Sequence, residues 1–178
     1  MPLFRTRSGL VAVLYKTNTV TIVNTAAETN IFTTSIAGGV MGTTGRVAWT
    51  IYGNSLNNSG AVRTFTLKVK LGASTLYNGT SATYSTATDR RPIVIRGGIQ
   101  NVGSAASQVF NGEFVMGSAT APTTGIGAIA AAMPLQAVLA GTATEDTTTA
   151  KSLTLTLTHS IANASLEMKF DSIVVELF

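Results

Sequence analysis

Arg63-Thr64-Phe65-Thr66-Leu67-Lys68-Val69-Lys70-Leu71 alternates apolar and polar side chains without a break. Successive side chains of a β-strand point to opposite faces, so Phe65, Leu67 and Val69 lie on one face with Leu71 while the threonines and lysines lie on the other. The segment is therefore predicted to be a strand with one buried face. Residues 72–74 follow as a turn, and residues 75–78 supply a short partner strand, which predicts a hairpin.

A second alternation lies near the C-terminus. Leu153, Leu155 and Leu157 alternate with threonines, and after a turn at residues 162–164 the apolar side chains continue up to residue 177. The apolar phase slips by one residue between Phe170 and Ile173. A strand changes faces in this way only at a bulge or bend, so we expect a β-bulge near residues 171–172.

The rest of the chain shows weaker strand patterns, and turn residues recur about every ten positions. Long amphipathic helices are missing from the pattern. About eight long strands are expected, which is the number in a jelly roll, so the fold class is predicted to be an all-β jelly-roll β-sandwich over residues 19–178. The weaker strands are expected at residues 20–24, 30–36, 46–52, 92–100 and 107–116.

Two segments fall outside this sandwich pattern. Residues 1–18 are predicted to form an N-terminal arm, and residues 117–146 an Ala/Gly-rich insertion that holds at most one short helix. The insertion is apolar with almost no charge, and exposed apolar surface usually marks a partner interface, although the insertion could instead be a flap packed on its own sandwich. The candidate partner interface is Arg5, Arg7, Lys16, Ile126, Ile129, Met133, Leu135 and Leu139.

The composition favours a component of an assembly. Charged residues make up 11% of the chain, well below the usual quarter, so the polar surface must be mostly Thr, Ser and Asn. Interface cores are depleted in charge, and Thr suits the outward face of a strand. The net charge is +4, but the basic residues are scattered and no stripe of basic and aromatic residues marks a nucleic-acid groove. They are expected to be solvated surface or contacts to an acidic partner.

The chain has no cysteine, which excludes disulfides and cysteine metal sites. The apolar run at residues 10–14 is too short for a signal peptide or for a membrane span. We therefore expect a cytoplasmic protein that is assembled where it is made, without a membrane partner.

Few residues could support catalysis. His159 is the single histidine, and we expect it to be a surface or turn residue beside the end of a strand. Glu145 and Asp146 are neighbours in a Thr-rich loop, where solvation is expected rather than calcium binding. No pair of carboxylates is arranged for glycoside hydrolysis. The chain is thus predicted to have no catalytic, cofactor or metal site and not to be an enzyme.

Four aromatic residues, Trp49, Tyr52, Tyr77 and Tyr84, are candidates for stacking on sugars. Trp49 lies in the middle of a predicted strand and is expected in the core. Tyr77 and Tyr84 flank a loop of Gly, Ser and Thr, so these two are expected at the surface. The glycine-containing stretches lack the Gly-Lys-Ser/Thr of a phosphate loop and are predicted to be turns.

The order of several short motifs resembles a known group of proteins: small tailed-bacteriophage structural proteins with a single jelly-roll domain. The group includes capsid decoration (cement) proteins and tail-fibre or head-spike modules. The similarity covers residues 20–117 and 147–178. The motifs that carry it are TAAETNIF at 25–32, GGVMG at 38–42, GRV at 45–47, RTFTLKVKLG at 63–72, residues 92–100, and SLTLTLT at 152–158.

The resemblance implies a jelly roll, a homotrimer and no enzymatic activity. The function expected from it is capsid decoration, in which the protein binds the major capsid protein on the outer surface of the virion and stabilises the shell. The alternative is a tail-fibre, baseplate or head-spike receptor-binding module that contacts another virion protein. Two other functions are less consistent with the sequence. The missing carboxylate pair argues against a sugar-cleaving enzyme, and the missing signal peptide argues against a host lectin.

Overall fold

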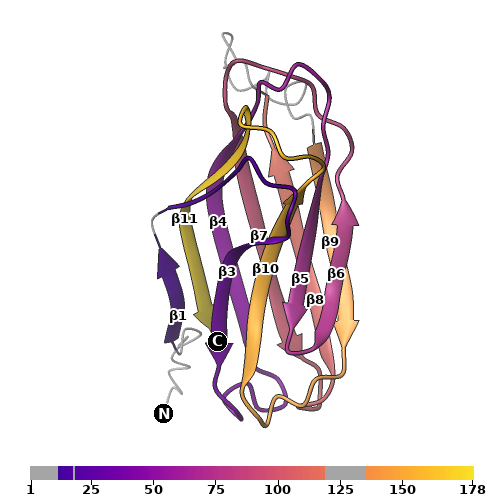
Figure 1. The fold of residues 1–178 in the computed structure, drawn as a ribbon. Helices are drawn as coiled ribbons and strands as arrows, with labels where there is room; N and C mark the ends of the chain where they lie inside the picture. Colours follow the sequence, from indigo (N-terminus) through magenta and orange to yellow (C-terminus); the bar gives the residue numbers. More distant parts are fainter. Residues whose placement is uncertain (1–11, 18, 119–134) are drawn as a thin grey trace, which may run out of the picture.

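The computed structural model describes residues 12–17, 19–118 and 135–178, and it shows two antiparallel β-sheets packed face to face (Figure 1). The described residues form eleven strands and no helix, which confirms the all-β class. One sheet has seven strands and the other has four. The strands are β1 Ala12–Thr17, β2 Val20–Val23, β3 Thr29–Ile36, β4 Arg46–Asn57, β5 Phe65–Leu71, β6 Ser74–Thr80, β7 Arg91–Asn101, β8 Gln108–Met116, β9 Leu135–Ala143, β10 Lys151–His159 and β11 Leu166–Leu177.

The strand order is that of a jelly roll. The seven-stranded sheet contains the order β1-β11-β4-β7, and the four-stranded sheet has the order β3-β10-β5-β6. The antiparallel pairs β5/β6, β4/β7, β3/β10 and β1/β11 are nested along the chain, like one long hairpin rolled into two sheets. β2 also pairs with β11, and β8 and β9 form an extra hairpin that widens the larger sheet beyond β7.

The hairpin expected from the opening stretch is confirmed. Leu71 pairs with Ser74, and the two-residue turn between them places Gly72 at a positive φ of 56°. Glycine at the first turn position suits a hairpin turn whose twist matches the strands. The bulge expected in the last strand is confirmed as well, because the pairing of β11 with β4 shifts between Phe170 and Ser172.

The core lies between the two sheets and is built by the alternating apolar residues. Trp49 is 2% exposed, as expected, and its ring stacks on Phe110 with a centroid distance of 5.7 Å and an interplanar angle of 13°. Gly97 makes room for this pair, because a Cβ atom at that position would lie 2.6 Å from the Trp49 ring. Phe32 approaches Trp49 from the four-stranded sheet at 6.1 Å, so aromatic rings tie the two layers together.

The proposed insertion at 117–146 requires a correction. Its last third is β9, which pairs with β8 over nine residues, and the side chains of Leu135 and Leu139 are buried at 8% and 2% exposure. Small residues alternate with these leucines, so β9 fits closely over the neighbouring layer: a Cβ on Gly141 would lie 1.7 Å from the carbonyl oxygen of Leu76. The segment is a strand of the sandwich, and residues 119–134 lie outside the described residues.

The proposed arm also needs a correction. Residues 12–17 form β1 and pair with β11 from Ala12 opposite Leu177 to Thr17 opposite Ile173. A row of backbone hydrogen bonds therefore attaches this segment to the larger sheet. Residues 1–11 lie outside the described residues.

Candidate interaction surface

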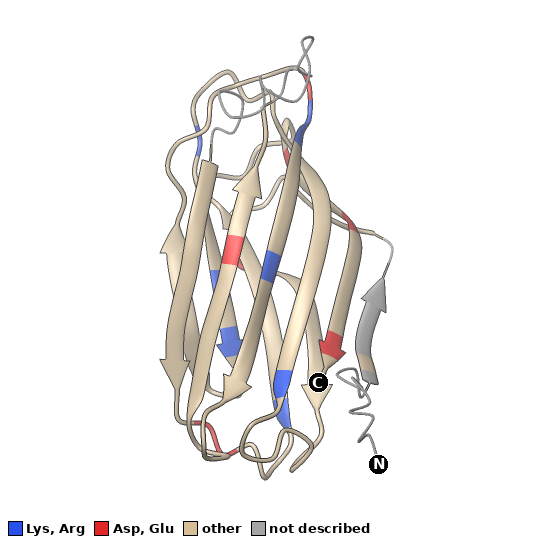
Figure 2. Ribbon diagram, turned by 180° about the vertical axis from the view of Figure 1, so that it is seen from behind, with Lys and Arg blue, Asp and Glu red and all other residues tan. Residues whose placement is uncertain are grey.

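The outer face of the seven-stranded sheet is broad, and over β4, β7, β8 and β9 its charged side chains are few (Figure 2). Two further ion pairs, Arg90 with Glu167 and Lys169 with Asp171, lie along β11. Its side chains are the ones that alternate with the core residues of β4, β7, β8 and β9, and the register places them in rows across the strands. We call this the outer face. Its principal members are Tyr52, Val94, Arg96, Gln100, Asn111, Glu113, Val115, Gln136, Val138, Ala140 and Thr142.

One ion pair lies in the middle of the outer face. Arg96 stands opposite Glu113, and the guanidinium Nη1 lies 3.0 Å from the carboxylate Oε1. Tyr52 and then Glu113 raise the pKa of Arg96 by hydrogen bonding to it, so the guanidinium stays charged. Because its charge is matched locally, this pair adds polarity without adding net charge to the surface.

Large apolar side chains surround the ion pair. Val138 is 85% exposed in the same row, and Tyr52 is 47% exposed in the next row beside Val94 and Val115. Exposed side chains of this size gain free energy when a partner covers them, at about 25 cal/mol per Å² of apolar area. The outer face therefore has the mixture of apolar and neutral polar groups that is typical of a protein interface.

A shallow depression of about 330 Å³ lies at one end of the outer face. Arg46 extends over Gly98, where a Cβ atom would lie 2.8 Å from the Arg46 Nε, so glycine allows the guanidinium to lie against the sheet. Gln100 and Asn111 line the same depression, and neither they nor Arg46 form a side-chain hydrogen bond or ion pair within the described residues. The depression thus offers three unoccupied polar groups to solvent or to a ligand.

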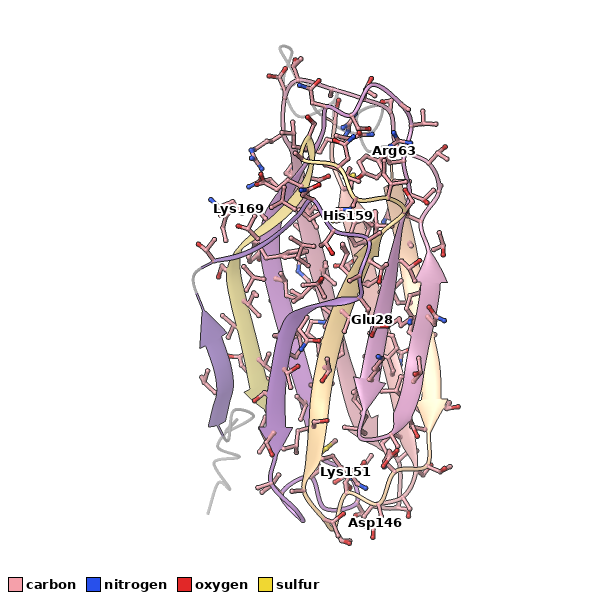
Figure 3. All side chains as sticks on the ribbon, in the orientation of Figure 1. Glu28, Arg63, Asp146, Lys151, His159 and Lys169 are labelled. Atoms are coloured by element: carbon pink, nitrogen blue, oxygen red, sulfur yellow. The ribbon has the colours of Figure 1, made fainter. Side chains whose placement is uncertain are left out.

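The opposite face, on the four-stranded sheet, is covered by threonines and by one charged cluster. Glu28 lies halfway along this sheet (Figure 3), where its carboxylate binds the ammonium groups of Lys68, at 2.6 Å, and Lys70, and accepts a hydrogen bond from the Thr156 hydroxyl at 3.0 Å. These donors, Lys68 first, lower the pKa of Glu28 from 4.5 to about 2. The Glu28 carboxylate thus already accepts from three donors and is not a candidate acid or base.

Glu145 does not have the solvated position expected from the sequence. Its side chain is 11% exposed and forms an ion pair with Lys151 at 3.0 Å. It also accepts hydrogen bonds from the Ser74 hydroxyl and the Ala73 amide, at 2.8 and 3.1 Å. These donors, Ser74 first, lower the pKa of Glu145. Through these contacts the Glu145 side chain holds the β5–β6 turn against the start of β10.

A polar network fixes the loops at the same end of the sandwich. The buried amide of Asn101 donates to the Thr147 hydroxyl at 2.8 Å and to the Gly42 carbonyl at 2.7 Å. Gln108 donates to the Asn101 side chain at 3.0 Å and to the Ala105 carbonyl at 2.9 Å. Because each buried amide is well satisfied, the loops at this end are held in one arrangement.

His159 is buried, so the expectation of a surface or turn histidine is wrong. It is 2% exposed at the end of β10, opposite Phe65, and its Nε2 group donates to the Ile22 carbonyl at 3.3 Å. Burial lowers the pKa of His159, and the hydrogen bond to Ile22 offsets this only in part. No carboxylate contacts the ring among the described residues.

Tyr84 is also buried, at 1% exposure, which corrects its placement at the surface. It packs edge-on against Phe65 at 6.0 Å and lies under the guanidinium of Arg91. Tyr77 is half-buried against the core, so neither tyrosine offers a free ring to a sugar. Tyr52 is the exposed aromatic, at 47%. The sequence identifies it as one of four possible stacking residues, but its exposure depends on which face of β4 turns outward, and the sequence does not show that.

The candidate interface residues are only partly placed. Leu135 and Leu139 are core residues and, in this conformation, are not offered to a partner. The backbone of Lys16 pairs with Val174 in the β1–β11 ladder. The other predicted members, Arg5, Arg7, Ile126, Ile129 and Met133, lie outside the described residues.

Within the described ranges the structure shows neither a metal-binding cluster nor a membrane-spanning helix. Within residues 12–17, 19–118 and 135–178, no group of three or more His, Asp or Glu side chains is placed to hold a metal ion. In those same ranges the structure has no helix of the length and hydropathy needed to cross a bilayer.

Comparisons with known proteins show a weak structural similarity and no similarity to a family. No protein-family model matches the chain, and no curated protein matches it. Among solved structures, the chain is similar to the CBM2 module of the evolved Dit of Lactobacillus casei BL23 phage J-1. The TM-score is 0.42 at 8% identity, with 92% of this chain and 75% of that chain covered. A similarity of this size does not assign a function.

Proposed function

We propose that the protein is a non-enzymatic structural component of a tailed-phage virion, and specifically a capsid decoration protein. In this role it binds the outer surface of the major capsid protein as a homotrimer and stabilises the shell. It is made in the host cytoplasm and acts at the capsid surface, without nucleic acid, membrane or cofactor as partner.

The observation that carries this proposal is the outer face of the seven-stranded sheet. Over β4, β7, β8 and β9 it presents Tyr52, Val94, Val115 and Val138 around the Arg96–Glu113 ion pair. A surface this wide and this poor in net charge is suited to contact with another protein. The jelly-roll strand order and the motif order, which resembles that of small tailed-phage structural proteins, support a structural role in the virion.

The proposed effect on the shell follows from linkage. A protein that binds the assembled capsid and not its dissociated subunits stabilises the assembled state by its binding free energy. A flat face can span two neighbouring capsid subunits. We therefore expect capsids to lose their DNA at a higher temperature when the protein is bound.

The test uses purified protein and capsids that lack it. Tyr52→Lys places a charge in the middle of the outer face, and Ser152→Lys places the same charge on the exposed surface of the other sheet as a matched control. We expect Y52K to weaken capsid binding at least tenfold, because a desolvated lysine opposes burial, whereas S152K should bind like the wild type. Equal binding by both variants would contradict the role of the outer face, and no binding by the wild type would contradict capsid decoration.

The alternative function, a tail-fibre, baseplate or head-spike receptor-binding module, is favoured by the depression around Arg46. Its guanidinium and the amides of Gln100 and Asn111 could bind the hydroxyl and carboxylate groups of a surface glycan. Under this alternative the wild type should bind host polysaccharide, and Arg46→Gln should lose that binding without any change in capsid binding.

A further inference from the structure

β9 is an edge strand that lacks the features by which proteins usually block exposed edges. The edge strands β1, β3 and β6 each have a register shift in their pairing, and such bulges interrupt the row of free hydrogen-bonding groups. β9 pairs with β8 without any shift, from Ala143 opposite Gln108 to Leu135 opposite Met116. It also contains no charged residue and no proline. β9 therefore remains a regular, neutral template for another strand.

The hydrogen bonds next to β8 show which groups of β9 are free. The amides of Gly117 and Val102 donate to the carbonyls of Pro92 and Ser107, at 2.8 and 2.9 Å, so odd-numbered residues of β8 face β7. Hydrogen bonding alternates along an antiparallel ladder, so the even-numbered residues of β8 face β9 and bond to its odd-numbered residues. No described strand pairs with the other side of β9, and the N–H and C=O groups without a partner among the described residues belong to the exposed Gln136, Val138, Ala140 and Thr142.

The sequence of β9 is complementary to itself in one antiparallel register. If a two-fold axis passes beside Leu139, Gln136 pairs with Thr142 of the other copy and Val138 pairs with Ala140 of the other copy. This register uses all four free residues of each strand, for about eight backbone hydrogen bonds. In two kinds of pair a large side chain faces a small one, because Val138 meets Ala140 and Leu135 meets Ala143 of the other copy. Leu139 meets Leu139 of the other copy at the axis.

We propose that β9 pairs with β9 of a second copy of this chain, which joins the two seven-stranded sheets into one continuous sheet. The occupant is a second copy because the register matches itself and because no charge on either strand opposes the pairing. The inference goes beyond capsid binding and does not depend on it. If the proposed trimer also forms, each trimer presents three such edges, and the two-fold contact links neighbouring trimers.

The first test measures the mass of the full chain by light scattering over a range of concentrations. The wild type should form an assembly with an even number of 18.4 kDa chains, a dimer or a hexamer. Val138→Pro removes a free N–H group at the edge but no bond to β8, and proline is tolerated at such a position. V138P should halve the mass or weaken the association at least tenfold, whereas the control V138T, which keeps the N–H group, should not.

The second test is independent of any substitution. In the wild type, the four outward amides should exchange with deuterium slowly at high protein concentration and rapidly on dilution, while the amides bonded to β8 stay protected at both concentrations. The proposal is overturned if the wild type contains an odd number of chains, if folded V138P associates like the wild type, or if the outward amides exchange rapidly at every concentration. Failure of capsid binding alone would leave these results unchanged.

Discussion

Replacing Glu28 with glutamine removes the charge that two lysines share on the four-stranded sheet. In the variant, Lys68 and Lys70 repel each other without compensation, while the side-chain shape and the hydrogen bond with Thr156 are largely kept. The fold should survive, because none of these groups belongs to the core. The free energy of unfolding should fall.

The size of the loss can be worked from the pKa. The pKa of Glu28 falls from 4.5 to about 2, which corresponds to at most about 3.4 kcal/mol at about 1.36 kcal/mol per pKa unit. The carboxylate is 30% exposed and therefore screened by water. Exposed ion pairs contribute about 0.2–1 kcal/mol each, so we expect E28Q to lose about 1 kcal/mol.

The sign of the pH dependence follows from the lowered pKa. The folded protein keeps Glu28 charged down to about pH 2, whereas the unfolded chain takes up a proton near pH 4.5. The stabilisation is therefore fully present above pH 4.5 and is lost as the pH falls toward 2. The difference between wild type and E28Q should shrink by about half or more between pH 7 and about pH 3.

Urea denaturation followed by tryptophan fluorescence measures both effects. Glu176→Gln is the control, because Glu176 forms no ion pair within the described residues but carries the same charge. The reasoning is refuted if E28Q and E176Q lose the same stability at neutral pH, or if the loss in E28Q is the same at low pH.

Three further predictions concern the core and its pH dependence. Burial lowers the pKa of His159 below the ordinary histidine value of 6.5, so its contribution to the free energy of unfolding should be complete above pH 6.5 and should decrease as the pH falls below 6.5. Urea titrations of H159Q should show no such decrease. Gly141→Ala should lose about 1–3 kcal/mol and raise deuterium exchange in β6, because its methyl group would collide with the Leu76 carbonyl; unchanged stability would contradict the tight contact of β6 and β9. Phe110→Ala should lose about 3–5 kcal/mol and shift the emission of Trp49, the single tryptophan, to longer wavelength, and an unshifted spectrum would argue against the ring stack.

Much of the sandwich follows from local alternation. The segment from Arg63 to Leu71 identifies its own buried face, and the slip at Phe170 locates a bulge before any partner strand is known. Such features are encoded in neighbouring residues. The strand patterns at β2, β3, β4, β7 and β8 were also placed correctly, with β4 longer than expected.

β9 was missed because its central residues are apolar on both faces. Val138 and Ala140 on the outside look like Leu139 on the inside, so the alternation that reveals a strand is hidden. Alanine and glycine also have low strand propensity, which favoured a loop. The strand is specified by its fit to β8 and to Leu76, and that fit involves residues far away in the sequence.

The candidate surface could be predicted only in its general character. The low charge pointed to an interface, but five of the eight residues chosen were apolar ones in the insertion, and two of these, Leu135 and Leu139, are core residues. His159 and Tyr84 show the same limit. Each is buried by a segment distant in sequence, β2 in one case and the chain around Arg63 in the other, so local pattern could not place them.

The nested order of the strand pairs has a consequence for biosynthesis. The β5–β6 hairpin can close as soon as it leaves the ribosome, but β4 must wait for β7, β3 for β10, and β1 for the last strand of all. Long-range pairing of this kind is slow, with folding times of milliseconds to seconds. A nascent chain therefore exposes the apolar faces of incomplete sheets until β11 has been synthesised. Truncation within β11 should yield insoluble product rather than a smaller folded domain.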